Sequence, residues 1–348
     1  MLYHGGEKGR CGSGRMRRGF LVAAAVAGVL ASSSLARAVD PGLDDALTIY
    51  RRGGYAEALT KLSAIAARRD PEAEYWIGAI YEKGQGVPRD LAAAARWYGL
   101  AADQGFAAAA FRLGLFYDAG KGVTANRATA LQLYQTAAKL GHLDAMRAIG
   151  MAYESGNGVE RSIPNALAWY RRAADHGDND SFNRARRLAL AMNGDGGLPR
   201  FDAAFVVFQR GEQIRALGDL LDASEAGDAE AMAWLGNFYE NGYAGPKDFA
   251  AALKYYAAAS AAGSLKGKTD YATALVYGVG TKPDRAKAVA LLTEAAGGGF
   301  ALAQYNLAFL MKEGGDGAAP DPAAARHWYR AAGLLGYLPA WDELRRLN

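Results

Sequence analysis

The sequence predicts an all-α solenoid, and three observations support this fold class. Landmark residues return every 36 positions, as Gly78, Gly114 and Gly150 show. Each copy contains two stretches with the apolar periodicity of an amphipathic helix, and glycines separate the two stretches. A fixed step of this length indicates one supersecondary unit copied in tandem. We therefore expect helix pairs that stack on one another along the chain.

The first complete unit covers residues 73–105. Apolar residues at positions i, i+4 and i+8 of the stretch 73–81 form one helical stripe. Gly78 lies beside this stripe, where a neighbouring helix can approach closely. Gly84 stands where a helix often ends in a left-handed residue, and Asp90 is placed to cap the second helix. The unit is therefore predicted to be helix, glycine turn, helix.

The repeated motif is a Leu-Gly pair, a tyrosine, Gly-x-Gly-Val, Trp-Tyr, Ala-Ala and a final glycine. In the unit at 107–142 it consists of Leu113-Gly114, Tyr117, Gly120-x-Gly122-Val123, Leu133-Tyr134, Ala137-Ala138 and Gly141. This pattern resembles the Sel-1-like repeat, a relative of the tetratricopeptide repeat. The resemblance implies a right-handed superhelix of antiparallel helix pairs, which the family uses mainly to hold other proteins.

The units fall into two modules of the same order. A helical starter precedes units at 71–106, 107–142 and 143–178, and a single helix from Ser181 closes the module at 192. After a glycine-rich break at 193–200 the order restarts, with units at 229–264, 265–300 and 301–337 and a closing helix. We expect an internal duplication, with modules at 39–192 and 201–348. The repeat pattern does not decide whether they continue as one superhelix.

The first 38 residues have the features of a cleaved export signal. Arg17-Arg18 precede an apolar run, and Ala36-Arg37-Ala38 offers a small-x-small cleavage site. The run is too short and too rich in alanine for a stable membrane span. We expect cleavage after Ala38 and a periplasmic or secreted protein. The less favoured alternative is an uncleaved N-terminal anchor. Two details stay open: general secretory or twin-arginine export, and Met1 or Met16 as the start.

Removal of the leader changes the charge balance. The chain has 40 Lys and Arg against 36 Asp and Glu, but the leader takes six of the basic residues and one of the acidic ones. The remaining 34 against 35 give no basic surface for nucleic acid or an anionic membrane. Arginine pairs such as Arg171-Arg172 are expected on solvated helix faces. The only cysteine, Cys11, lies in the leader, so the exported chain has no disulfide.

No residue pattern predicts catalysis. His142 and His176 flank turn glycines and are expected to be solvated caps, and His327 is expected to be exposed on a second helix. No histidines have metal-ligand spacing, and no serine stands in a nucleophile elbow. The Gly-x-Gly loops join helices rather than following a strand, which favours turns over a phosphate site. We expect no catalytic, cofactor-binding or metal-binding residue, although part of the family has been labelled β-lactamase-like.

The resemblance also indicates where a partner would bind. In the related tetratricopeptide fold, first helices line the concave face, and positions around the Leu-Gly pair point inward. Carried over by position, the groove residues are Tyr75, Trp76, Phe111, Arg112, Leu115, Arg147, Met151, Trp234, Asn237, Tyr305, Asn306 and Phe309. They are rich in aromatic, Met and Arg side chains, as interfaces are.

We therefore expect a non-enzymatic scaffold of the bacterial cell envelope that binds a protein or peptide. The alternatives are an accessory role in envelope polysaccharide assembly or export and, less favoured, a hydrolase. The sequence identifies neither the partner nor the oligomeric state.

Overall fold

The computed structural model describes residues 41–192, 198–315 and 318–347. The predicted export signal and the centre of the glycine-rich break lie outside these residues. The first half contains α2 (Pro41–Arg51), α3 (Tyr55–Ala66), α4 (Pro71–Lys83), α5 (Leu91–Asp103), α6 (Ala107–Ala119), α7 (Arg127–Lys139), α8 (Leu143–Ser155), α9 (Ile163–Asp175) and α10 (Asn179–Ala191). The second half contains α11 (Arg200–Gln209), α12 (Gln213–Glu225), α13 (Ala229–Asn241), α14 (Phe249–Ala261), α15 (Leu265–Tyr277), α16 (Arg285–Gly297), α17 (Ala301–Glu313), α18 (Pro322–Leu334) and α19 (Pro339–Arg346).

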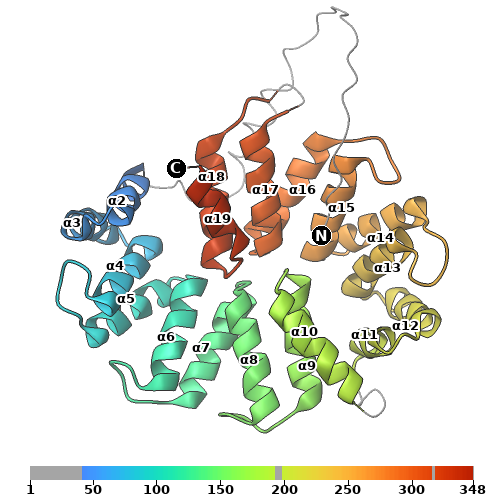
Figure 1. The fold of residues 1–348 in the computed structure, drawn as a ribbon, viewed down its shortest axis with the longest axis horizontal. Coiled ribbons are helices and arrows are strands. Elements are labelled where there is room, and N and C mark those ends of the chain that lie inside the picture. Colours follow the sequence, from blue (N-terminus) through green and yellow to red (C-terminus); the bar gives the residue numbers. More distant parts are fainter. Residues whose placement is uncertain (1–40, 193–197, 316–317, 348) are drawn as a thin grey trace, which may run out of the picture. The chain divides into compact units, whose positions relative to one another are not determined.

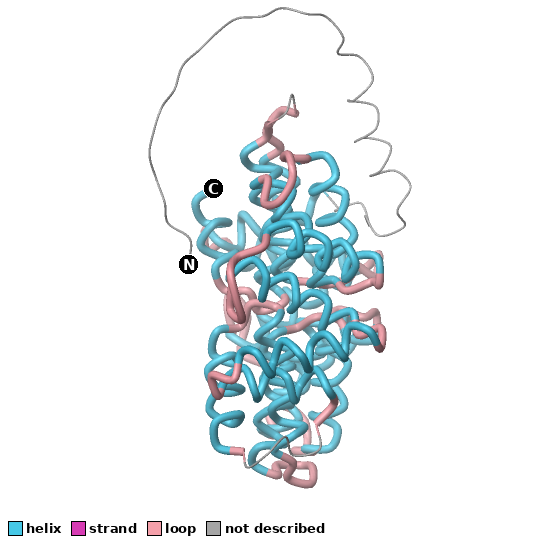
Figure 2. Tube along the Cα trace, turned by 90° about the vertical axis from the view of Figure 1, so that its right-hand side faces the viewer, coloured by secondary structure: helices cyan, strands magenta, loops and turns pink. Residues whose placement is uncertain are grey.

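These helices confirm the predicted all-α solenoid. Consecutive helices pack as antiparallel neighbours in chain order (Figure 1), and helix is the only regular element drawn along the described chain (Figure 2). The series α2–α10 and α11–α19 have the same order, a starter pair, three pairs and a closing helix. The duplication and the right-handed superhelix stay predictions. None of the described helices combines the length and apolarity needed to cross a bilayer.

Caps fix the helix ends within each unit. The Asp90 carboxylate accepts a hydrogen bond of 2.8 Å from the amide of Ala93, which confirms it as the cap of α5. Gly84 ends α4 in the left-handed region at φ 68°, as predicted. Asp248, Asp284 and Asp321 cap their helices in the same way. The recurring acid of the repeat therefore has a structural role.

A tyrosine ring packed on a glycine joins the two helices of a unit. A Cβ placed on Gly78 would lie 2.9 Å from the Tyr98 ring, closer than side chains tolerate. The predicted close approach at Gly78 is therefore made by the second helix of its own unit. Three other glycines meet their tyrosines in the same way, at 2.6, 2.6 and 2.3 Å: Gly114 with Tyr134, Gly150 with Tyr170, and Gly236 with Tyr256.

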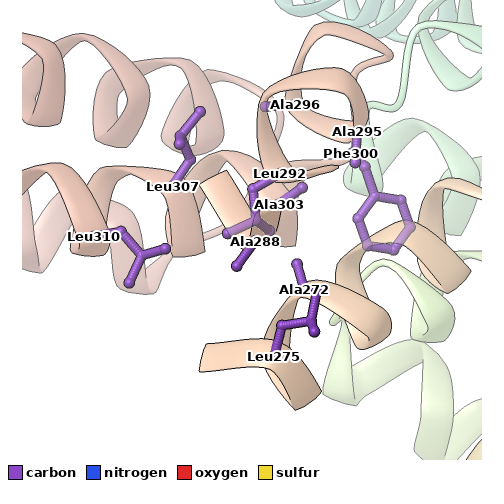
Figure 3. Close-up of a cluster of buried hydrophobic side chains, with 10 residues drawn as sticks. All are labelled: Ala272, Leu275, Ala288, Leu292, Ala295, Ala296, Phe300, Ala303, Leu307 and Leu310. Atoms are coloured by element: carbon purple, nitrogen blue, oxygen red, sulfur yellow. The ribbon is translucent and has the colours of Figure 1, made fainter. Parts of the chain in front are cut away.

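The fifth unit changes both members of this contact. Ala272 occupies the glycine position and Leu292 the tyrosine position, and both are buried in one cluster of α15, α16 and α17 (Figure 3). Because leucine is smaller than tyrosine, the helix can carry a methyl group at this position without a clash. The two replacements keep the volume between the helices filled.

A hydrogen bond adds to the ring contact in three units. The hydroxyl group of the tyrosine donates to a glutamate 16 residues earlier, from Tyr98 to Glu82 at 2.6 Å and from Tyr170 to Glu154 at 2.7 Å. Tyr256 donates to Glu240 at 2.5 Å. Each bond ties the second helix to the end of the first through a charged acceptor.

The inner turns of the two halves touch, so the inner side of the solenoid is partly filled. The amide of Leu143 donates to the carbonyl of Leu335 at 2.8 Å, and a Cβ on Gly141 would lie 1.9 Å from the carbonyl oxygen of Gly299. Ala107, Leu143, Ala301 and Leu335 form a small buried cluster at this contact. We call this set of contacts between residues 140–143 and residues 299–301 and 335–336 the closure.

We predict that Gly114→Ala lowers the free energy of unfolding by about 1–3 kcal/mol, because the added methyl group overlaps the Tyr134 ring. Gly99→Ala is the matched control: it also lies inside a helix, but nothing approaches its Cβ position within 4 Å. This control should stabilise the protein by about 0.5–1 kcal/mol. Urea denaturation followed by circular dichroism measures both, and equal effects would contradict the prediction.

We also predict that Tyr98→Phe costs about 1–2 kcal/mol of unfolding free energy, because it removes a hydrogen bond to a carboxylate. Tyr134→Phe serves as the control, since its ring is equally enclosed by its unit but its hydroxyl group makes no such bond with Asp118. Its cost should stay below about 0.5 kcal/mol. The same denaturation assay checks the difference, and no difference would show that the bond contributes nothing.

Candidate functional site

A pocket lies among α6, α7, α8 and α10. It has a volume of about 790 Å³ and brings together four predicted groove residues, Phe111, Leu115, Arg147 and Met151. Ala148 and the ring of Tyr134 add further apolar surface. We call this site the α6–α8 pocket.

Apolar and charged side chains line this pocket together. Met151 is 46% exposed, which is high for a large apolar side chain. Arg147 is held in place by Asp178 at 2.9 Å and by a close contact with Asp144. Two other arginines of the pocket have longer ion-pair distances: Arg127 lies 3.9 Å from Asp118, and Arg184 lies 3.8 Å from Glu154. The pocket thus combines the adaptable side chain of Met151, the firmly paired Arg147 and two more loosely paired arginines.

A second pocket of about 370 Å³ holds four predicted residues, Tyr75, Trp76, Phe111 and Arg112. Its other wall comes from the C-terminal end of the chain, with Leu334, Gly336, Leu338 and Trp341. We call this site the capped pocket. Phe111 lines both pockets, so the two sites adjoin at its ring.

The rings of the capped pocket also pack within the solenoid. The Tyr75 ring lies 5.4 Å from Phe106 and 5.6 Å from Tyr98, measured between centroids. The indole of Trp76 lies 5.5 Å from Tyr50 and donates to Glu72 at 3.3 Å. Both side chains are half-buried. They serve the packing of neighbouring repeats as well as lining the pocket.

Trp234 and Asn237 join a buried ionic network instead of either pocket. The indole N–H of Trp234 donates to Asp175 at 3.1 Å, and the Asn237 amide donates to Asp270 at 3.4 Å. Lys266 bonds the same Asp270 at 2.6 Å. Burial raises the pKa of both Asp175 and Asp270, with their cationic partners opposing the rise.

Arg171 anchors this network, and its predicted place on a solvated face is wrong. The side chain is buried because α11 packs over it, and its guanidinium pairs with Asp175 at 2.6 Å and closely with Asp202. It also lies 4.1 Å from the centre of the Phe201 ring. Nothing in an Arg-Arg pair distinguishes a buried arginine from an exposed one, so sequence reasoning missed the network.

The last three predicted residues lie apart, on α17. Tyr305 packs between Tyr329 and Tyr337 at centroid distances of 5.3 and 5.1 Å. Asn306 is half-buried, and Phe309 is 40% exposed with the Lys312 ammonium 5.7 Å from its ring centre. The predicted residues are therefore divided among two adjoining pockets, an ionic network and α17.

The histidines are not exposed, contrary to prediction. His142 is only 4% exposed and packs on Phe111 at a centroid distance of 4.5 Å. Burial, together with the charges of Arg112 and Arg147, lowers its pKa to about 3. His176 and His327 are half-buried, and burial lowers the pKa of each to about 4, with a contribution from Arg172 and Arg330 respectively. The turns that carry the first two are covered by the other half.

In residues 41–192, 198–315 and 318–347, no three His, Asp, Glu or Cys side chains gather as metal ligands. Both pockets are lined by apolar and charged side chains, and they could bind side chains of the same two kinds. Ser155 of the α6–α8 pocket donates its hydroxyl hydrogen to the Met151 carbonyl at 2.8 Å, within its own helix.

Comparisons with solved structures give several helical-repeat proteins. A Sel1 repeat protein from Oxalobacter formigenes is 28% identical, with a TM-score of 0.38, and the match covers 84% of this chain and 97% of that one. The protective antigen c5321 of uropathogenic Escherichia coli, described as having an SLR fold, is 25% identical with a TM-score of 0.39. That match covers 83% of this chain and 59% of the antigen. No curated protein sequence matches this chain.

The family profile for the Sel1 repeat matches six segments. They are residues 71–106, 107–142, 143–178, 229–264, 269–300 and 301–337. The segment at 269–300 begins four residues later than predicted. The other segments have the boundaries predicted from the repeat pattern. These matches cover more than half of the chain. The chain therefore belongs to the Sel1 repeat family.

Proposed function

We propose that this protein is a non-enzymatic scaffold that binds a partner protein or peptide through the α6–α8 pocket. Sel1 repeat proteins generally mediate protein–protein interactions. The observation that carries the proposal is that one pocket gathers Phe111, Leu115, Arg147 and Met151, four of the residues predicted to face a partner.

The packing of the pocket supports binding without a large ordering cost. Its walls are helices whose backbones are fixed by the Gly114–Tyr134 and Gly150–Tyr170 contacts. A partner would therefore meet a preformed surface, and little of the binding free energy would be lost in ordering the receptor. Met151 can adapt its side chain to the partner while the backbone stays in place.

The proposed setting is the bacterial cell envelope. The support for this location comes from the leader sequence, in which Arg17-Arg18, an apolar run and Ala36-Arg37-Ala38 follow in the order of an export signal. N-terminal sequencing of the protein recovered from its host tests this part of the proposal. A protein that still begins before residue 39 would contradict it.

We predict that Met151→Glu lowers recovery of the partner from an envelope fraction by about tenfold or more, because a charge replaces the exposed apolar contact in the pocket. The measurement is quantitative affinity enrichment, with a photo-crosslinking amino acid at position 151 to show direct contact. Ile214→Glu is the matched control, since Ile214 is 79% exposed on α12 and lines neither pocket.

The control should retain the partners of the wild type, and a crosslinker at position 214 should not capture them. If Met151→Glu recovers the same proteins in the same amounts as the wild type, the α6–α8 pocket is not the binding site.

A further inference from the structure

All three histidines of the described chain lie at or beside the closure. His142 immediately precedes Leu143, whose amide bonds the carbonyl of Leu335 across the closure. His176 packs on Phe300 of the other half at a centroid distance of 4.3 Å. His327 lines a cavity of about 350 Å³ together with Leu140 and Gly299. The Nδ1 atoms of all three are buried and make no hydrogen bond with the described protein.

The groups around His142 are unfavourable for a positive charge. Arg112 approaches from α6 and Arg147 from α8. Asp144, Glu82 and Lys83 line the same pocket, but both carboxylates are already engaged, Asp144 by Arg147 and Glu82 by the Tyr98 hydroxyl group. The residues from α18 and α19 that line this pocket carry no charge. A protonated His142 would therefore have no free carboxylate as a partner.

His176 and His327 have similar surroundings. Arg172 is the nearest charged group that acts on His176, and Asp175, Glu230 and Lys266 of the same cavity are tied into the ionic network. His327 faces Arg330, whose guanidinium pairs with Glu72 at 2.8 Å and closely with Asp44. Lys139 adds a further positive charge to the wall of that cavity.

The direction of the pH effect follows from these surroundings. The pKa of each buried imidazole lies below its ordinary value of 6.5. The closed arrangement therefore binds fewer protons than an open one, and its stability is full above about pH 6.5 and falls as the pH decreases toward 4. Separation of the two halves would let water solvate the imidazole rings, which would remove the free-energy cost of protonating them.

We propose that protonation of His142, His176 and His327 separates the two halves at the closure and thereby uncovers the capped pocket. The C-terminal wall of that pocket, Leu334 to Trp341, is held by the Leu335 carbonyl and by the packing of Gly336 against Leu143. Loss of these contacts exposes Tyr75 and Trp76. The separation does not rest on the proposed function, which places the partner in the α6–α8 pocket.

Hydrogen exchange of single amides, measured by NMR at about pH 7.5 and about pH 5, tests the separation. The amide of Leu143 reports the closure, and the amide of Asn126, bonded to the Tyr117 carbonyl within one repeat, is the internal control. We expect the protection of Leu143, corrected for the intrinsic pH dependence, to fall by about tenfold or more relative to Asn126 on acidification. Small-angle scattering should show a larger radius with an unchanged helical circular dichroism signal.

A triple variant should remove this pH response: His142→Phe, His176→Phe and His327→Phe. Each substitution keeps an aromatic ring at its position but removes the group that takes up a proton. If the triple variant does not fold, His176→Phe alone should reduce the loss of protection. Equal protection of Leu143 at both pH values in the wild type, or the same acid response in the folded variant, would overturn the proposal. Neither readout involves a partner, so failure of the proposed function leaves this test unaffected.

Discussion

The contact between a tyrosine ring and a glycine backbone sets the spacing of the two helices in four of the six repeat units. In four units the ring would come within 3 Å of a Cβ if the glycine carried one. This short distance aligns the two helices of a pair and places the tyrosine hydroxyl within reach of a glutamate in three of the units. A repeat built on this contact can stack on the next one without changing its own geometry.

Two units depart from this pairing: the sixth keeps a tyrosine, Tyr329, with Ala308 at the glycine position, and the fifth changes both residues. Ala272 and Leu292 replace glycine and tyrosine together, and both remain buried with Leu275 and Leu307 around them. A methyl group added on one helix is compensated by a smaller side chain on the other. Burial of both positions is therefore what the six units share, while the hydrogen bond of the tyrosine hydroxyl group is formed in three of them.

Local features of the fold could be predicted from the sequence because their causes are local. Asp90 and Gly84 act within a few residues of their own positions, and the repeat recurs six times. The closure could not be predicted, since Leu143 and Leu335 are 192 positions apart and carry no paired signature. The burial of His142 and Arg171 follows from such distant packing. The pocket residues were predictable by position within the repeat, but their division among separate sites depends on the same distant contacts.

The closure and the repeats differ in the kind of interaction that holds them. Within a repeat, the packing of apolar side chains and of the tyrosine rings on glycine does not depend on a titrating group. At the closure, one long-range backbone hydrogen bond and a small apolar cluster lie beside imidazoles that must stay uncharged. Mild acid therefore acts on the contact between the halves before it acts on the helix pairs. A solenoid with this distribution can change the access to its inner surface while each pair keeps its structure.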